Sequence, residues 1–205
     1  CRLRRQRQMC IRDRNEIFLE NDTEKLHQSL AKMNDINDLI EPLFNDKVFK
    51  LSRNTFNFKR TLDEIILNKF EGQIDTGEMM DSLLNKVFKS NIKVINNVSV
   101  ENYEDTGSSV QVCTDQFSLS CNKLFIATNG FSDAIIQEKV VPARAQVLIT
   151  KPIKNLSAIG TFHLEQGYYY FRNIDDRILL GGGRNLDFQA ENTCEFGITD
   201  SIQSK

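Results

Sequence analysis

The sequence feature that most constrains the fold is a short apolar run that ends in a turn. Residues 123–130 read Lys-Leu-Phe-Ile-Ala-Thr-Asn-Gly. Four consecutive apolar residues are too few for a helix, so the run predicts a strand that is buried on both faces of a sheet. Small and hydroxylated residues at the carboxyl end of such a strand let a ligand approach the backbone, as in open α/β sheets. The alternative is an ordinary buried strand that ends in a turn, and the octapeptide alone favours this alternative.

The composition is that of a globular cytoplasmic protein. Apolar residues make up 40% of the chain, charged residues 26%, and the formal net charge is -2. This charge gives no reason to expect a nucleic-acid or anionic-membrane partner. No apolar run approaches the roughly 20 residues of a membrane span. The five cysteines form no Cys-x-x-Cys pair and lack zinc spacing, so we expect reduced thiols and no metal site. The sequence does not define the oligomeric state.

The first fourteen residues differ from the rest of the chain. They are rich in Arg and contain neither Lys nor Ser. A basic arm that binds nucleic acid is one reading, whereas a transit peptide fits poorly without Ser. The segment resembles translated sequencing-adaptor sequence, and we favour that reading. We therefore expect residues 1–14 to be extraneous or disordered, and we expect the chain to begin within a gene.

Periodicity predicts two helices in the first half of the chain. Residues 23–44 carry apolar residues at spacings of three and four, with Asp22 or Thr23 as the cap and Pro42 near the end. Short strands are expected at 48–51 and 64–67. Asp75 and Glu78 form a plausible capping box for a second helix that ends near Asn91. A strand over 92–100 would follow it and complete half of a βαβ unit.

The second half of the chain reads mainly as antiparallel strands. Alternating residues and turn signals predict a β-meander over 101–122, inserted before the buried strand 123–127. A strand over 143–150 is bracketed by Pro142 and Pro152. Residues 167–184 then form a hairpin whose first strand is aromatic and whose second strand ends in three glycines. Such glycines expose backbone N–H groups and leave room for a planar ligand, although a flexible loop is an equal alternative.

Taken in order, these stretches resemble the DAO-type FAD-dependent oxidoreductases, the family of D-amino-acid oxidase, glycine oxidase and sarcosine oxidase. The stretches that carry the resemblance are Glu71–Asp75 at the start of a helix, the strand at Val100, Phe125–Gly130, Pro142–Val147, and the hairpin from Tyr169 to Gly182. No single motif is specific, but their order is. The family has an FAD-binding α/β domain that is interleaved with an antiparallel substrate domain.

The resemblance implies a fold class and a division of the chain. The class is α/β with α+β elements: a partial FAD/NAD(P)-binding Rossmann-like domain with an inserted β-meander, plus part of an antiparallel β substrate domain. Residues 15–70 would belong to the substrate or helical region, 71–139 to the FAD-binding domain and 140–205 to the substrate domain.

The resemblance also implies site residues. Val100 would contact the adenine of FAD through its backbone, and Thr128, Asn129 and Gly130 would lie along the pyrophosphate and ribityl chain. Gly181 and Gly182 would lie near the flavin ring.

On the substrate side, the strand from Tyr168 to Arg172 would line the cavity, with Tyr169 and Arg172 as candidate catalytic residues. Gln146 would reach toward the cofactor. An equally good alternative pairs Arg172 with Asp175 or Asp176 in the hairpin turn. We expect His163 to have a packing or surface role.

The sequence departs from the family pattern in three places. It lacks the Gly-x-Gly-x-x-Gly fingerprint, which places a pyrophosphate at a helix N-terminus. It also lacks the acidic residue after the second strand and the C-terminal segment that carries an arginine for a substrate carboxylate. The chain therefore resembles the middle of such an enzyme, truncated at both ends. We expect these 205 residues alone not to bind flavin stably.

The implied activity is oxidation of the C–N bond of an amine or amino acid by hydride transfer to the flavin. A neutral amine is already reactive, so no strong base is required. One alternative is a non-catalytic flavin-fold fragment or binding protein. Another is a tRNA-modifying FAD oxidoreductase relative, against which the near-neutral charge argues. The sequence defines neither the amine nor the electron acceptor.

Overall fold

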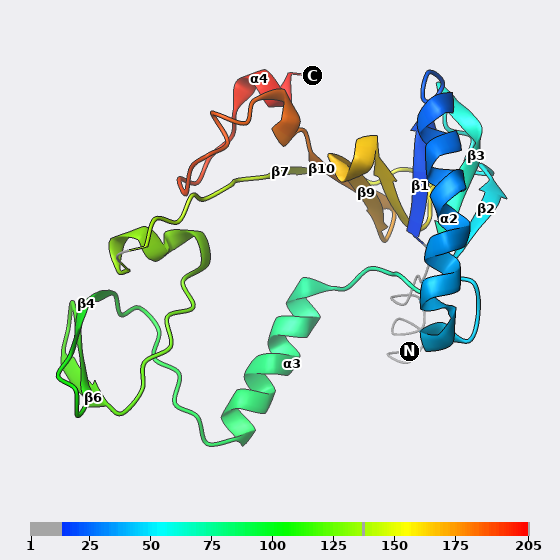
Figure 1. Cartoon of the computed structure of the whole chain (residues 1–205). Helices are drawn as coiled ribbons and strands as arrows, with labels where there is room; N and C mark the ends of the chain where they lie inside the picture. Colours follow the sequence, from blue (N-terminus) through cyan, green and yellow to red (C-terminus); the bar gives the residue numbers. More distant parts are fainter. Residues whose placement is uncertain (1–13, 137, 205) are drawn as a thin grey trace. The chain divides into compact units, whose positions relative to one another are not determined.

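The computed structural model describes residues 14–136 and 138–204, which form two units by their contacts (Figure 1). Of the described residues, unit 1 comprises 14–76, Ala145–Asp187 and 200–204. Unit 2 comprises Gly77–Arg144 and Phe188–Thr199. The expectation for residues 1–13 lies outside the described residues. Arg14, which we had grouped with them, is instead the first residue of a strand.

Unit 1 is built on a seven-stranded sheet of order β2-β3-β1-β8-β9-β10-β7. All neighbouring strands are antiparallel except β1 and β8, which are parallel. The strands are β1 Arg14–Leu19, β2 Phe49–Arg53, β3 Thr61–Asn68, β7 Gln146–Ile149, β8 Thr161–Leu164, β9 Tyr169–Ile174 and β10 Arg177–Gly182. The predicted hairpin, the strand after Pro142 and the two short strands before residue 70 are confirmed, whereas β1 was not predicted.

Helix α2, Thr23–Phe44, has the predicted bounds and runs along β1, β2 and β3 (Figure 1). Its Leu26 packs against Phe18 and Ile66 in a small apolar cluster, which Leu30 and Met33 extend. The predicted cap differs in detail. The side chain of Asp22 accepts a hydrogen bond from the Leu19 backbone N–H at 3.2 Å and pairs with Lys25 at 2.7 Å, and it makes no capping bond to the helix.

Aromatic rings form much of the main core of unit 1, on one face of the sheet. Phe162 is fully buried, and its ring stacks on Phe171 with 4.6 Å between centroids. Phe56 and Phe58, from the β2–β3 connection, meet Phe162 edge to face. Ile17 and Ile65 complete this core. Because Phe162 and Phe171 lie opposite each other across β8 and β9, the core fixes which face each side chain of β9 occupies.

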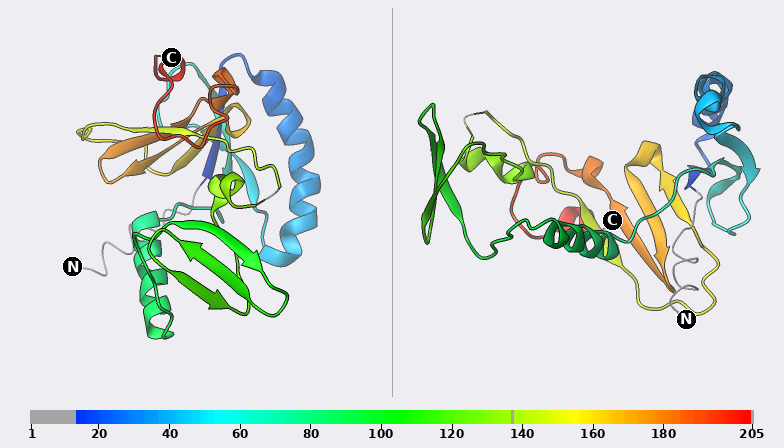
Figure 2. Two further views of the ribbon diagram at one scale, coloured as in Figure 1. Left: turned by 90° about the vertical axis from the view of Figure 1, so that its left-hand side faces the viewer. Right: turned by 90° about the horizontal axis from the view of Figure 1, so that it is seen from below.

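Unit 2 contains most of helix α3, Thr76–Lys89, and a three-stranded antiparallel sheet (Figure 2). The sheet strands are β4 Val100–Asp105, β5 Val110–Thr114 and β6 Ser118–Cys121. This confirms the predicted second helix and the predicted β-meander. Asn91, predicted as the helix stop, adopts a positive φ of 56° just after α3.

Two predicted strands of unit 2 are wrong. Residues 92–99 and 123–128 form no strand, and the side chains of Ile95 and Phe125 are 59% and 86% exposed. A strand that is buried on both faces needs neighbours on both sides. Among the described residues of unit 2, the paired strands are β4, β5 and β6 alone, and they pair antiparallel with one another. The apolar run therefore has no parallel sheet to join.

Across residues 14–136 and 138–204, the helices are all too short or too polar to cross a membrane.

Candidate functional site

Three residues that the sequence proposed for the site lie in one row across unit 1. Tyr169 of β9 is opposite Gly182 of β10, and Gly182 is opposite Gln146 of β7. Directly paired residues share a face of the sheet. The phenol of Tyr169 and the carboxamide of Gln146 are thus separated by a residue without a side chain.

The backbone at this end of β10 requires glycine. Gly182 has a φ of +125°, and a Cβ there would lie 2.1 Å from the carbonyl oxygen of Tyr168. Gly183 has a φ of +78°, and its N–H donates to the same carbonyl at 3.1 Å. A Cβ on Gly183 would be 3.7 Å from the Tyr169 ring. It would also lie 3.0 Å from Ile202 Cγ2, so the side chains of Tyr169 and Ile202 pack against this glycine-only backbone.

Tyr169 presents an unpaired hydroxyl. The side chain is half-buried, and its hydroxyl makes no hydrogen bond to any residue that the structure describes. Burial raises the pKa of Tyr169, and the negative charge of Glu165 raises it further. The phenol is therefore protonated at neutral pH and can donate a hydrogen bond.

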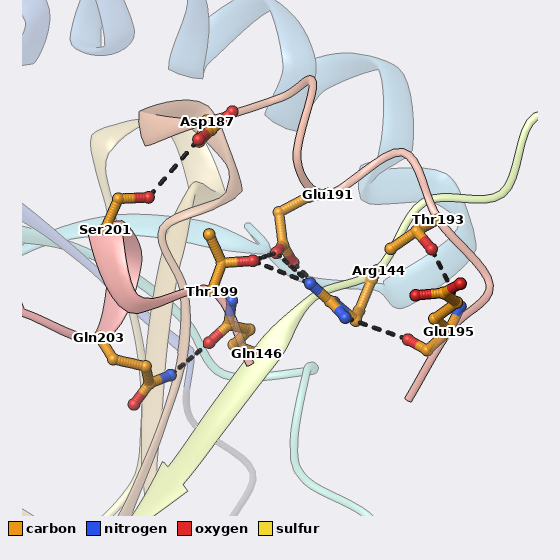
Figure 3. A network of polar contacts seen from close by, with 9 residues as sticks. All are labelled: Arg144, Gln146, Asp187, Glu191, Thr193, Glu195, Thr199, Ser201 and Gln203. Carbon is orange, nitrogen blue, oxygen red and sulfur yellow. Dashed lines mark hydrogen bonds and ion pairs between the residues drawn. The ribbon is translucent and has the colours of Figure 1, made fainter. Parts of the chain in front are cut away.

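Gln146 is held at the other end of the row. Its side chain is 6% exposed, and its amide oxygen accepts a hydrogen bond from the Gln203 side chain (Figure 3). Gln203 ends the short helix α4, Asp200–Gln203. The buried carboxamide of Gln146 is thus oriented by the end of the described chain. Its contact with a cofactor stays a prediction.

The other candidates on this hairpin face the opposite side of the sheet. Tyr170 pairs with Gly181, and the Tyr170 ring fills the space above that glycine, since a Cβ on Gly181 would lie 2.3 Å from Tyr170 Cζ. Arg172 lies on the same face as Tyr170, and its Nη1 donates to the Ile74 carbonyl at 2.8 Å. The alternative ion pair of Arg172 with Asp175 or Asp176 is not formed. Tyr169 and Arg172 therefore cannot line one cavity on the same face.

His163 belongs to a polar cluster on the Tyr170 face. The guanidinium of Arg14 donates to Glu71 at 2.7 Å and lies 2.9 Å from His163 Nδ1. Arginine has only donors, so Nδ1 is the acceptor and the ring proton is on Nε2. Burial lowers the pKa of His163, and the charge of Arg14 lowers it further. These contacts give His163 a structural role, as expected.

The candidates in unit 2 lie on an edge strand and in a short turn. Val100 begins β4, which is an edge of the three-stranded sheet. The hydroxyls of Thr128 and Ser132 are 3.0 Å apart, and Ser132 Oγ donates to the Asn129 carbonyl at 2.6 Å. Asn129 has a φ of 51° and begins the 3₁₀ helix η1, Asn129–Ala134. A Cβ on Gly130 would lie 3.3 Å from Pro142 Cβ, so the turn packs closely on that proline.

Arg144 is the centre of a polar network in unit 2 (Figure 3). Its Nη2 donates to Glu191 Oε1 at 2.9 Å and to Thr199 Oγ1 at 2.8 Å, and its Nη1 donates to the Glu195 carbonyl at 3.0 Å. The hydrogen bond to Glu191 raises the pKa of Arg144. Glu191 is fully buried. Sequence reasoning missed it, because one acidic residue in a polar segment carries no periodic signal.

No group of three or more His, Cys, Asp or Glu side chains that could hold a metal occurs within the described ranges.

Comparisons with known proteins give one family-model match and two solved structures with a similar fold. The family model "DAO: FAD dependent oxidoreductase" matches residues 18–204. L-amino acid deaminase from Proteus vulgaris matches with a TM-score of 0.62 and 12% identity, over 84% of this chain and 42% of that chain. L-proline dehydrogenase from P. horikoshii matches with a TM-score of 0.64 and 12% identity, over 99% of this chain and 57% of that chain. At this identity the two structures show a shared fold, and the chain spans about half of their length. No curated protein sequence matches.

Proposed function

The chain belongs to the DAO family of FAD-dependent oxidoreductases, and we propose that it is part of an enzyme that oxidises the C–N bond of an amine or amino acid. The observation that carries this proposal is the row of Tyr169, Gly182 and Gln146, which sets a hydrogen-bond donor beside a residue without a side chain. The two similar structures support the substrate class, since one is titled an L-amino acid deaminase and the other an L-proline dehydrogenase.

The DAO family is FAD dependent, and the residues present fit parts of such a cofactor. Bound FAD supplies the acceptor for a hydride. Val100, on the free edge of β4, would offer its backbone to the adenine. Thr128, Asn129 and Gly130 would lie along the pyrophosphate and ribityl chain.

The glycines of β10 fit a flat ring in different ways. Gly182 places no side chain between Tyr169 and Gln146. Gly181 would contribute only its backbone, because the Tyr170 ring fills its side-chain position.

The proposed role of Tyr169 is to orient the substrate. Its protonated, unpaired hydroxyl can donate to a substrate carboxylate or to the lone pair of a neutral amine. A phenol with a raised pKa is a poor base at neutral pH, but a neutral amine needs no base. Arg172 faces the other side of the sheet and is bound to the Ile74 carbonyl, so the geometry favours Tyr169 over Arg172.

A small-molecule substrate and a cytoplasmic location are part of this proposal. The location rests on the isolated thiols Cys113, Cys121 and Cys194. The main alternative is a flavin-fold binding protein without activity. It predicts that no amine reduces bound flavin.

The experiment is a pair of tyrosine variants in the complete protein that contains this chain. Tyr169→Phe removes the hydroxyl that faces the proposed site, and Tyr170→Phe removes one on the opposite face. We expect Tyr169→Phe to lower kcat/KM for the best amine substrate about tenfold, as the loss of one hydrogen bond does. Tyr170→Phe should leave kcat/KM unchanged. Equal effects, or a larger effect of Tyr170→Phe, would refute the assignment.

A further inference from the structure

Unit 1 has a second concave site, between α2 and strands β1, β2 and β3. The cavity has a volume of about 330 Å³. Its apolar lining comes from Met33 and Ile36 of α2, Phe49 of β2 and Ile66 of β3. Its polar lining consists of Arg14, Glu16, Ser29, Lys32 and Asn68. This volume is at the lower end of the roughly 300–1,000 Å³ of small-molecule sites, so it suits a small ligand with an apolar part.

This cavity is not part of the proposed redox site. Glu16 pairs across the sheet with His163, His163 with Tyr170, and Tyr170 with Gly181. Glu16 therefore shares the Tyr170 face, which is opposite to that of Tyr169. The cavity also lies over β1, β2 and β3, whereas the proposed row lies on β9, β10 and β7.

Glu16 brings an unpaired carboxylate to the cavity wall. The side chain is half-buried and makes no hydrogen bond or ion pair with the described part of the chain. Arg14 also lines the cavity, but its guanidinium is bound to Glu71 and His163 and makes no ion pair with Glu16. Burial raises the pKa of Glu16, while Arg14 lowers it and Glu71 raises it further. A carboxylate that lacks donors in a partly apolar site is stabilised by a ligand that supplies them.

Lys32 brings the opposite charge to the same cavity. It is exposed on α2, and among residues 14–136 and 138–204 no carboxylate lies within ion-pair distance of its ammonium. The cavity lining therefore carries a negatively charged hydrogen-bond acceptor, Glu16, and a positively charged donor, Lys32, beside its apolar side chains. A monocarboxylate would leave Glu16 without a partner, and a simple amine would leave Lys32 without one.

We propose that this cavity binds a free α-amino acid with an apolar side chain. The ligand ammonium pairs with Glu16, the carboxylate pairs with Lys32, and the side chain packs against Met33, Ile36, Phe49 and Ile66. The proposal does not depend on the redox function, because it uses residues on the other face of the sheet. It assigns unit 1 an amino-acid site distinct from the row at Tyr169.

The test uses L-leucine as the probe and isothermal titration calorimetry on the complete protein. We expect binding of L-leucine and at least tenfold weaker binding of 4-methylpentanoate, which lacks the amine, and of 3-methylbutylamine, which lacks the carboxylate. Glu16→Gln and Lys32→Gln should each raise the Kd of L-leucine about tenfold or more. Lys47→Gln changes an exposed lysine outside the cavity and should leave the Kd unchanged.

Tyr169→Phe separates this site from the proposed redox site. The variant should leave the Kd of L-leucine unchanged, because Tyr169 lies on the opposite face. A Kd that responds to Tyr169→Phe but not to Glu16→Gln would place the amino acid at the redox site and overturn the proposal. So would the absence of L-leucine binding, or equal binding of the three probes. If L-leucine binds and its Kd depends on Glu16 and Lys32, but the protein oxidises no amine, the proposed function is refuted and the amino-acid site is not.

Discussion

At the scale of single residues, one nitrogen of His163 determines how the ring is protonated. The Arg14 guanidinium donates to Nδ1, so the ring is neutral and carries its proton on Nε2. Protonation of the ring would place two cations side by side and break this contact. The low pKa of His163 therefore follows from burial first and from its neighbour second.

This pKa predicts how stability depends on pH. The folded chain holds fewer protons on His163 than the unfolded chain, whose ring titrates near 6.5. The free energy of unfolding should therefore have its full value above about pH 6.5 and decrease as the pH falls toward the folded pKa. His163→Gln removes this titration and should flatten the decrease. Urea unfolding at about pH 7.5 and about pH 5 measures it.

The other histidine of the chain provides the control. His27 lies on α2, outside the contact with Arg14, so His27→Gln is the matched control for replacing a histidine by glutamine. Glu16 contributes in the opposite direction because its pKa is raised, but its contribution is common to all three proteins. An identical pH dependence in His163→Gln and wild type would contradict the lowering of the His163 pKa by burial and by Arg14.

At this scale, the sequence names candidate residues only where a local pattern exists. Tyr169, Gly182 and Gln146 were named from motifs, and the register of β9, β10 and β7 places them in one row. Their function stays a proposal. Glu16 and Glu191 could not be found from the sequence. Glu16 is distinguished by partial burial without an ion-pair partner, and Glu191 by full burial beside Arg144. Both depend on residues far along the chain.

At the scale of elements, the β9–β10 hairpin needs its two last glycines for different reasons. The position of a Cβ on Gly181 is taken by the end of the Tyr170 side chain, which can rotate away. The position of a Cβ on Gly182 is taken by a main-chain carbonyl, and its φ of +125° disfavours any other residue.

The two glycines should therefore respond differently to substitution. Gly182→Ala should lower the free energy of unfolding by about 1–3 kcal/mol, the usual cost of a strained backbone. Gly181→Ala should cost less, and Tyr170→Leu in the same chain should relieve that cost. Tyr170→Leu should not relieve Gly182→Ala. Urea unfolding of the single and double variants measures these differences, and equal rescue of both glycine variants would contradict the explanation.

Elements with a local signal were predictable, whereas strands that depend on distant partners were not. The bounds of α2 follow from apolar spacing, and the β-meander follows from alternation and turn residues. Residues 123–127 carry the apolar run that is typical of a buried strand, but they form no strand. An apolar run does not encode the neighbouring strands with which it would have to pair. Strand β1 was missed because it begins at Arg14, within the atypical N-terminal segment that was set aside.

At the scale of the whole molecule, the two units differ in how much they bury. The core of unit 1 is a continuous aromatic and aliphatic cluster on one face of its sheet. Among the described residues of unit 2, the buried side chains are Val112, Ser132 and Glu191, while Leu83 and Phe88 of α3 are 47% and 60% exposed. The two units are defined by contacts between residues. The division of the chain into domains at residues 70 and 139 stays a prediction.

The central claim is that this chain is part of an FAD-dependent enzyme that oxidises amines or amino acids. Its most direct test is an anaerobic titration of the purified complete protein with amines and amino acids. The readout is the visible absorbance of the bound flavin. We expect the protein to contain or take up FAD, and we expect an amine or amino acid to bleach the absorbance of the flavin stoichiometrically. A protein that takes up no FAD, or whose flavin no amine or amino acid reduces while another class of donor does, would contradict it.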